Sequence, residues 1–496
     1  MKYKNNPSDI LETISNLSND EVFTPPSVAN EMLDQLPKEI WTNPNIKILD
    51  PCSKTGIFLR ESAKRLYVGL EKEIPDEKIR RDHIFINNLY GIPITELTSL
   101  ISRRTLYYSK DASSEYSVTK LPNKHGNLYY ERSEHDFFAE KCRICGAVED
   151  TLGRGEKFEN YAYPFLHNSN IYSDMKFDVV IGNPPYQLDD GGFGRSASPI
   201  YNLFVEQAFK LKPRYVCMII PSRWFSGGKG LKTFRENMLQ TKNLTDLVDY
   251  PNSEDVFPNV TIRGGVSYFL WDKNYEGKCH VKTFQNGELL SESKRYLGEH
   301  GDIFVRNNES LTIINKIDKK SSHYMDELIS VSNPFGMRTN FENYTDKKTG
   351  TKLKLYTKFS KTGYVHPKFV TKNEDLIYKY KVITLAAYGT GGKPPYKVMG
   401  NPIIAKPGEV CSETYIVCGS FNTLKEAKNL EMYMSTKFFR FLVFLRTITQ
   451  HIKSNSFKFV PIVDFHKEWT DKDLYKYFKL TDKEIDLIEN TITQMS

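Results

Sequence analysis

The segment IKILDPCSKTGIFLRESAKRL, residues 46–66, constrains the fold of this chain more than any other. Its apolar beginning predicts a buried strand, its polar middle a turn, and its remainder an amphipathic helix. A strand, turn and helix in this order are typical of the first unit of a doubly wound α/β sheet. Because ligands of such sheets bind at the carboxyl ends of the strands, Asp50 is placed at a candidate binding edge.

A second strand ends in an unusual turn in FDVVIGNPPYQ, residues 177–187. The prolines end the strand, so Asn183 lies at its tip, and Pro184 and Pro185 hold the chain extended without N–H groups. The Asn183 side-chain oxygen and the Pro184 carbonyl can each accept one N–H of an exocyclic amine, with Tyr186 stacked on the ring. An isolated Asn-Pro would indicate only a turn, but N-P-P-Y after a strand is far more restrictive.

The whole chain has the size and composition of a two-domain protein. Its 496 residues are too many for one core. No apolar run approaches the ~18 residues of a membrane span, and the N-terminus lacks the apolar stretch of a secretion signal. Seven irregularly spaced cysteines favour reduced thiols over disulfides. We therefore expect a cytoplasmic protein that does not contact membranes.

Positive charge is concentrated in residues 351–400, which we call the basic window. It holds ten lysines against two acidic residues, a net charge of +8, and eight aromatic residues are interleaved with them. Lysines that meet phosphates and rings that meet bases are typical of nucleic-acid binding, although a solvated surface is the alternative. The predicted DNA-binding residues are Lys358, Lys361, Tyr364, Lys368, Lys393 and Tyr396.

Several segments resemble the motifs of amino-methyltransferases. N-P-P-Y resembles motif IV, which makes Asn183, Pro184, Pro185 and Tyr186 the catalytic candidates. VFTPPSVANEML, residues 22–33, resembles motif X, whose members contact S-adenosylmethionine, and DPCSKTG resembles motif I, D-P-x-x-G-[ST]-G. Lys54 stands where motif I has its first glycine, so either Lys54 has a positive φ or the turn is rebuilt. The cofactor-binding residues that this resemblance implies are Phe23, Thr24, Asp50, Pro51, Gly56 and Asn183.

Two further residues complete the predicted site. Glu96 is the carboxylate nearest to the end of the second strand and is the candidate for the cofactor ribose, although an acid that only compensates a helix dipole is the alternative. Phe257 resembles the motif VIII aromatic residue that stacks on the target base, with an ordinary core phenylalanine as the alternative.

The motif order X, I, IV, VIII resembles that of γ-type N6-adenine DNA methyltransferases, and the Eco57I-type restriction-modification methylases in particular. The stretches ITELTSLISRR, GRSASPIY and IIPSRWFSGGKGL carry this likeness further. It implies a doubly wound class I methyltransferase domain over 1–275, with an insertion at about 110–170, and an α+β target-recognition domain over 300–496. It also implies double-stranded DNA as substrate, S-adenosylmethionine as cofactor, and base flipping.

The insertion contains CRICG, whose Cys142 and Cys145 have the spacing of a metal knuckle. A closed zinc site needs two more ligands, and the nearest candidates are His135 and His167. Two idle reduced cysteines are the alternative. Because the stretch is separate from the motifs, we expect any zinc to be structural.

Other functions remain open at this stage. A protein-glutamine methyltransferase uses the same N-P-P-Y but needs no basic domain of ~200 residues. N4-cytosine enzymes usually carry Ser in place of Asn183, whereas an RNA adenine methyltransferase and a catalytically silent DNA-specificity subunit are both compatible with the sequence. Only about 20 residues precede the motif X segment, too few for a nuclease core. Any cognate restriction endonuclease is therefore expected to be a separate protein.

Overall fold

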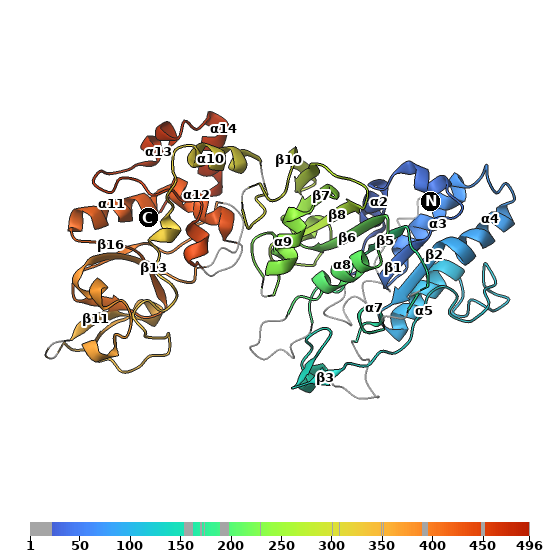
Figure 1. Ribbon diagram of the computed structural model, residues 1–496, viewed down its shortest axis with the longest axis horizontal. Coiled ribbons are helices and arrows are strands. Elements are labelled where there is room, and N and C mark those ends of the chain that lie inside the picture. The colour runs from blue at the N-terminus through green and yellow to red at the C-terminus, as the bar shows by residue number, and fades with distance from the viewer. Residues whose placement is uncertain are drawn as a thin grey trace, which may run out of the picture. The chain divides into compact units, whose positions relative to one another are not determined.

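The computed structural model describes residues 22–495 except 153–161, 169–170, 173, 189–197, 229, 300, 307, 349, 351, 389–394 and 448–451. The chain divides into two compact units, Met1–Asp302 and Ile303–Ser496. Figure 1 shows both, with the first coloured from blue to olive and the second from yellow to red. The first unit extends past residue 275, the predicted end of the catalytic segment, because strands within 279–295 join its sheet.

The first unit contains an eight-stranded sheet in the order β10-β9-β7-β8-β6-β5-β1-β2. The strands β2, β1, β5 and β6 run parallel, whereas β8 is antiparallel to β6 and β7, and β10 to β9. The strands are β1 (Ile48–Ser53), β2 (Leu89–Pro93), β5 (Val179–Gly182), β6 (Tyr215–Pro221), β7 (Leu244–Tyr250), β8 (Val266–Asp272), β9 (Cys279–Gln285) and β10 (Glu288–Arg295).

The order of the parallel strands creates a switch point between β1 and β5. From β1 the chain passes through α3 (Ile57–Gly69) to β2, and then through α5 (Glu96–Tyr107) to a parallel bridge between Gly91 and Leu128. From β5 it passes through α8 (Tyr201–Lys210) to β6, in the opposite direction across the sheet. Because such crossovers are right-handed, α3 and α5 cover one face and α8 the other. The predicted doubly wound α/β fold is confirmed, and its ligand-binding position lies between β1 and β5.

The helices of this unit follow from local signals. α2 begins at a proline, which suits a first helical position, and α5 is capped by Thr95, whose hydroxyl accepts the N–H of Thr98 at 3.1 Å. The helices outside the insertion are α2 (Pro26–Asp34), α3 (Ile57–Gly69), α4 (Glu77–His83), α5 (Glu96–Tyr107), α8 (Tyr201–Lys210) and α9 (Lys232–Gln240).

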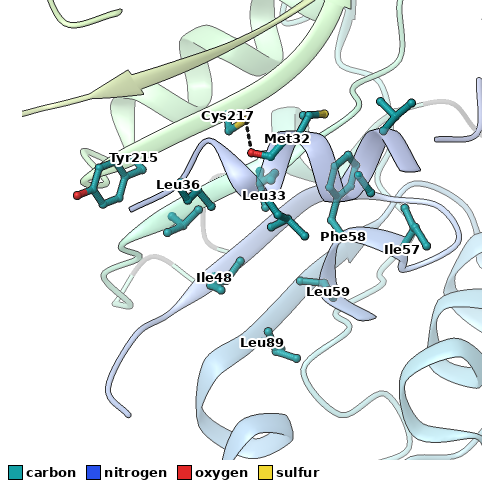
Figure 2. Close-up of a cluster of buried hydrophobic side chains, with 14 of the residues drawn as sticks. Met32, Leu33, Leu36, Ile48, Ile57, Phe58, Leu59, Leu89, Tyr215 and Cys217 are labelled. Atoms are coloured by element: carbon teal, nitrogen blue, oxygen red, sulfur yellow. Dashed lines mark hydrogen bonds between the residues drawn. The ribbon is translucent and has the colours of Figure 1, made fainter. Parts of the chain in front are cut away.

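The core of the first unit joins helix α2 to the sheet. Figure 2 shows Met32, Leu33 and Leu36 packed with Ile48 and Phe58. The thiol of Cys217 on β6 donates a hydrogen bond of 3.7 Å to the carbonyl of Met32 (Figure 2). This packing holds the chain segment that precedes α2 close to the end of β1.

The insertion lies between α5 and β5. It contains a short antiparallel hairpin and two short helices, among loops. Its elements are β3 (Phe137–Phe138), β4 (Lys141–Cys142), α6 (Glu149–Leu152) and α7 (Pro164–His167).

The second unit is α+β, as predicted. It has two three-stranded sheets, β12-β11-β15 and β14-β13-β16, and a helical core. Its strands are β11 (Leu353–Tyr356), β12 (Thr362–Val365), β13 (Tyr380–Leu385), β14 (Ile403–Ala405), β15 (Glu409–Cys411) and β16 (Tyr415–Phe421). Its helices are α10 (Asn308–Asp318), α11 (Leu424–Ser435), α12 (Lys437–Arg446), α13 (Asp471–Tyr477) and α14 (Asp482–Thr491).

None of the helices within the described residues has the length and the apolar character that crossing a bilayer requires.

Candidate active site

A pocket lies at the switch point between β1 and β5. The segment before α2, the end of β1, the start of α3 and the residue after β5 form its wall. The lining residues are Thr24, Asp50, Cys52, Lys54, Thr55, Gly56, Ile57, Phe58 and Asn183. Three segments that are far apart in the sequence, and that were each predicted to belong to a ligand site, therefore meet in one pocket.

Asn183 directly follows β5 and is almost completely buried. Its side-chain N–H₂ donates to the Val22 carbonyl at 2.9 Å and to the Thr24 hydroxyl at 3.1 Å. These two acceptors fix the orientation of the amide, because only the nitrogen can donate. Its oxygen is buried and has no hydrogen-bond partner among the described residues. The pocket thus holds a fixed hydrogen-bond acceptor that is left for a ligand.

Lys54 fits the motif I turn without a left-handed backbone. The residue with a positive φ in this turn is Gly56, at 72°, and not Lys54. Gly56 is also the N-cap of α3. The Lys54 ammonium donates to the Val22 carbonyl at 3.0 Å, the same oxygen that accepts from Asn183. The turn is therefore rebuilt, and the lysine ties β1 to the segment before α2.

Asp50 is buried on β1, with 2% of its surface exposed. Its Oδ1 accepts the backbone N–H of Cys52 at 3.2 Å. Burial raises the pKa of Asp50 to about 7, opposed in part by the Cys52 N–H and the charge of Lys54. A cationic ligand group would favour the charged carboxylate, which suits Asp50 to bind an ammonium.

Gly182, the last residue of β5, was not predicted to be functional. A Cβ at this position would lie 2.9 Å from Asp50 Oδ1 and 2.9 Å from Cys52 Sγ. The absence of a side chain therefore allows β5 to approach the acid on β1. A glycine at the end of a strand permits such an approach, but only the packing of β5 against β1 reveals the contact.

Tyr186 packs against the core of the first unit, and its ring is part-buried. Its hydroxyl is buried near the Asn183 side chain, and burial raises its pKa well above the usual value, opposed in part by that amide. Pro184 and Pro185 are buried beside it. The N-P-P-Y turn is thus packed into the unit, with the tyrosine partly accessible.

Four other predicted residues lie outside the pocket wall. Phe257 is 1% exposed within the hydrophobic core, so its ring offers no open face to a base, which agrees with the alternative of a core phenylalanine. Glu96 is exposed at the first position of α5, three residues after β2 ends. Phe23 is part-buried next to Thr24, and Pro51 is buried on β1 next to Asp50.

The four predicted metal ligands meet in the insertion. One atom each of His135, Cys142, Cys145 and His167 lies within 4.8 Å of the others. Burial lowers the pKa of His135 to about 4 and also lowers that of His167, so both rings are neutral at pH 7. The side chains form a donor set suited to zinc.

The lysines of the basic window differ in their surroundings. Lys361 and Lys368 are exposed, whereas the ammonium of Lys358 lies 3.8 Å from the carboxylate of Glu342. Lys381 is fully buried on β13, and its ammonium donates to three backbone carbonyls. Lys393 lies outside the described residues. The exposed lysines group around the β11–β12 hairpin.

The aromatic residues of the basic window also fall into two groups. Tyr396 stacks on Phe444 with ring centres 5.0 Å apart and packs against the helical core. Tyr364 is part-buried on β12. Phe359, by contrast, is 83% exposed in the short turn between β11 and β12 and has a φ of 57°. Such a backbone is costly for a phenylalanine, and the sequence did not single out this exposed ring.

Comparisons with known proteins show which family this chain resembles. The family model described as Eco57I restriction-modification methylase matches residues 87–257. An uncharacterized adenine-specific methylase of Mycoplasma pneumoniae (strain ATCC 29342 / M129 / Subtype 1) is 38% identical over 313 residues, which cover 57% of this chain and 74% of that protein.

Similar solved structures include larger enzymes. The ATP-dependent type ISP restriction-modification enzyme LlaBIII bound to DNA is 14% identical with a TM-score of 0.46, covering 95% of this chain and 40% of that one. The type I methyltransferase subunit from Streptococcus thermophilus is 13% identical with a TM-score of 0.34, covering 58% of this chain and 54% of that one. This chain thus spans about half or less of these two proteins.

Proposed function

The chain belongs to the Eco57I-type family of adenine-specific restriction-modification methylases, and we propose from this premise that it methylates N6 of adenine in double-stranded DNA. We further propose that S-adenosylmethionine is the donor and that the chain is the modification part of a restriction-modification system. The observation that carries the proposal is the buried, unpartnered Asn183 oxygen beside Asp50 at the switch point.

Asn183 is suited to hold the amine that reacts. N6 of adenine has two N–H groups, and the Asn183 oxygen and the Pro184 carbonyl can accept one each. These hydrogen bonds draw the amine toward tetrahedral geometry and direct its lone pair, so no general base is needed to start the reaction. The lone pair would form the new N–C bond as the bond between the methyl group and the sulfonium sulfur breaks, with the sulfur leaving as a neutral thioether. One N–H proton would then pass to water.

Three of the candidate cofactor residues, Thr24, Asp50 and Gly56, line the same pocket as Asn183. S-adenosylmethionine, when bound, supplies an electrophilic methyl group. Asp50 would pair with its ammonium, Thr24 and Phe23 would contact its methionine end, and Gly56 would let the backbone come close. Glu96, near the end of the neighbouring strand, would hold the ribose hydroxyls. The residues present therefore fit the donor, because the pocket combines a buried acid with an adjacent glycine turn.

Access to a base inside a duplex requires base flipping. Tyr186 is the residue left to stack on the extruded adenine, since Phe257 is enclosed in the core.

DNA would be held by exposed lysines of the second unit. Removing Lys358, Lys361 and Lys368 together should weaken binding of all sequences about equally and reduce the salt slope by roughly one unit for each phosphate that is no longer bound. A triple variant with the parental DNA affinity and the parental salt slope would show that the basic window is only a solvated surface.

Methyl transfer from labelled S-adenosylmethionine tests the proposal against its alternatives. The full chain is incubated separately with double-stranded DNA, single-stranded RNA and a glutamine-containing protein substrate, and products are identified by mass spectrometry. We expect N6-methyladenine in DNA alone. Label only in RNA or on glutamine would select another methyltransferase class. DNA binding without cofactor binding or transfer would identify a silent specificity subunit.

We also propose that any zinc bound by the chain lies outside this chemistry, because its candidate ligands belong to the insertion and line no part of the pocket.

A further inference from the structure

We propose that His135, Cys142, Cys145 and His167 bind one zinc ion, which fastens the hairpin of the insertion to helix α7. This inference does not rest on the proposed methyl transfer, because it depends only on side chains outside the pocket.

The hairpin brings its two cysteines to one point. β3 and β4 pair through Phe137 and Cys142, and the chain turns between them with left-handed backbones at Ala139 and Glu140. After β4 it doubles back, since the Gly146 N–H donates to the Cys142 carbonyl at 2.9 Å and the Cys142 N–H to the Ala147 carbonyl at 2.8 Å. Gly146 has a φ of 74°, which allows this tight knuckle.

Two of the distances between ligand atoms match those of a tetrahedral zinc site. Cys142 Sγ lies 3.5 Å from His167 Nε2, and Cys145 Sγ lies 3.5 Å from His135 Nδ1. Zn–S and Zn–N bonds of about 2.3 and 2.0–2.1 Å at a tetrahedral angle place neighbouring sulfur and nitrogen atoms about 3.5–3.6 Å apart. Each cysteine is therefore paired with a histidine at the separation that a shared zinc ion would impose.

His167 is oriented for metal binding by the backbone. Its Nδ1 lies 3.0 Å from the Tyr163 carbonyl, so in the neutral ring the proton sits on Nδ1 and is donated to that oxygen. The lone pair of Nε2 then faces Cys142. An outer hydrogen bond of this kind is the usual partner of a zinc-bound histidine.

A pair of idle cysteines does not account for this arrangement. All seven cysteines of the chain are free thiols, and two buried thiols need no histidines around them. His167 comes from a segment 22 positions after Cys145, yet it reaches the knuckle. Convergence of two imidazoles on two thiols from separate segments is what a metal site requires.

The ion would be structural because the protein supplies all four ligands. Catalytic zinc sites keep one position open for water or substrate, whereas structural sites are closed. α7 also packs on α8, where Phe165 stacks on Phe204 with ring centres 5.8 Å apart. The zinc would thus anchor the hairpin through α7 to the helix that follows the N-P-P-Y strand.

Metal analysis of the full chain tests this inference. The protein is purified from zinc-supplemented cells without chelators, and metal is measured per chain. We expect about one zinc ion per chain. The double substitution Cys142→Ser with Cys145→Ser should remove it, whereas Cys279→Ala, a buried cysteine on β9, should retain it. Cobalt exchanged into the parent should give the thiolate charge-transfer and d–d bands of a tetrahedral Cys₂His₂ site.

A parent protein with far less than one zinc ion per chain would overturn the inference, as would a double variant that keeps its metal. If the double variant is insoluble, the inference is tested by removing zinc from the parent protein with a chelator. Zinc release should then make the hairpin of β3 and β4 sensitive to protease while the circular dichroism of the full chain stays nearly unchanged. Unchanged protease resistance after complete removal of zinc would contradict the fastening role.

Discussion

Replacing Asp50 by asparagine should separate the stability of the first unit from its ability to bind the cofactor. The side-chain amide oxygen of this variant can still accept the Cys52 N–H that Asp50 accepts at 3.2 Å, so the local geometry is preserved. Only the charge is lost. We expect the variant to be more stable than the parent at pH 8 in the absence of ligand, and to bind S-adenosylmethionine more weakly.

The size of the stability change follows from the pKa of Asp50. Burial raises this pKa from its ordinary value of 3.8 to about 7. Between these two values the folded protein holds a proton that the unfolded chain has released, so the free energy of unfolding falls as pH rises and levels off above about pH 7. At about 1.4 kcal/mol per pKa unit, the charged carboxylate costs on the order of 4 kcal/mol at pH 8.

The loss of cofactor affinity is set by the ion pair. A hydrogen bond to a charged group contributes about 1.5–3 kcal/mol, so the variant should bind S-adenosylmethionine roughly ten- to a hundredfold more weakly. Urea unfolding of the ligand-free proteins from pH 5 to 8 and calorimetric titration at pH 8 measure the two effects. A variant that is less stable than the parent at pH 8, or that binds the cofactor unchanged, would refute this reasoning.

Two further substitutions probe separate features. Gly182→Ala should weaken S-adenosylmethionine binding about tenfold or more by displacing Asp50, whose Oδ1 would lie 2.9 Å from the new Cβ. The control is Gly91→Ala on β2, where the new Cβ crowds mainly the ends of leucine side chains. Calorimetry should find its cofactor affinity unchanged. Equal losses of affinity in the two variants would indicate general destabilisation. Phe359→Gly should lower DNA affinity by about 1–3 kcal/mol with an unchanged salt slope, because the variant lacks the ring but keeps every charge. Anisotropy titrations at several salt concentrations would contradict a DNA contact at Phe359 if affinity stayed at the parental value.

The sequence predicted the residues that meet in the pocket because that meeting depends on strand order. Asp50 and Asn183 lie at the ends of parallel strands of a doubly wound sheet, and the carboxyl ends of such strands share one edge. The candidate zinc ligands were predicted in part from spacing, since Cys142 and Cys145 form a C-x-x-C. The choice of His167 over His125, which is closer in the sequence, depends on the folded insertion.

Other features depend on contacts that no local pattern reveals. Lys54 replaces a glycine because its ammonium reaches Val22, which is 32 positions away. Gly182 matters only because β5 packs against Asp50. Lys381 was counted with the basic window, but it lies on a buried strand where three carbonyls satisfy its charge. Charge counts along a sequence cannot separate such a lysine from an exposed one.

Sequencing of native DNA by a long-read method that detects modified bases tests the central claim most directly. Cells that express the parent chain are compared with cells that express Asn183→Ala. We expect N6-methyladenine at one recurrent sequence motif with the parent and none with the variant, which keeps the lysines proposed to bind DNA but lacks the acceptor for the amine. Absence of methylated adenine with the parent, or methylation by the variant within tenfold of the parental level, would contradict the account.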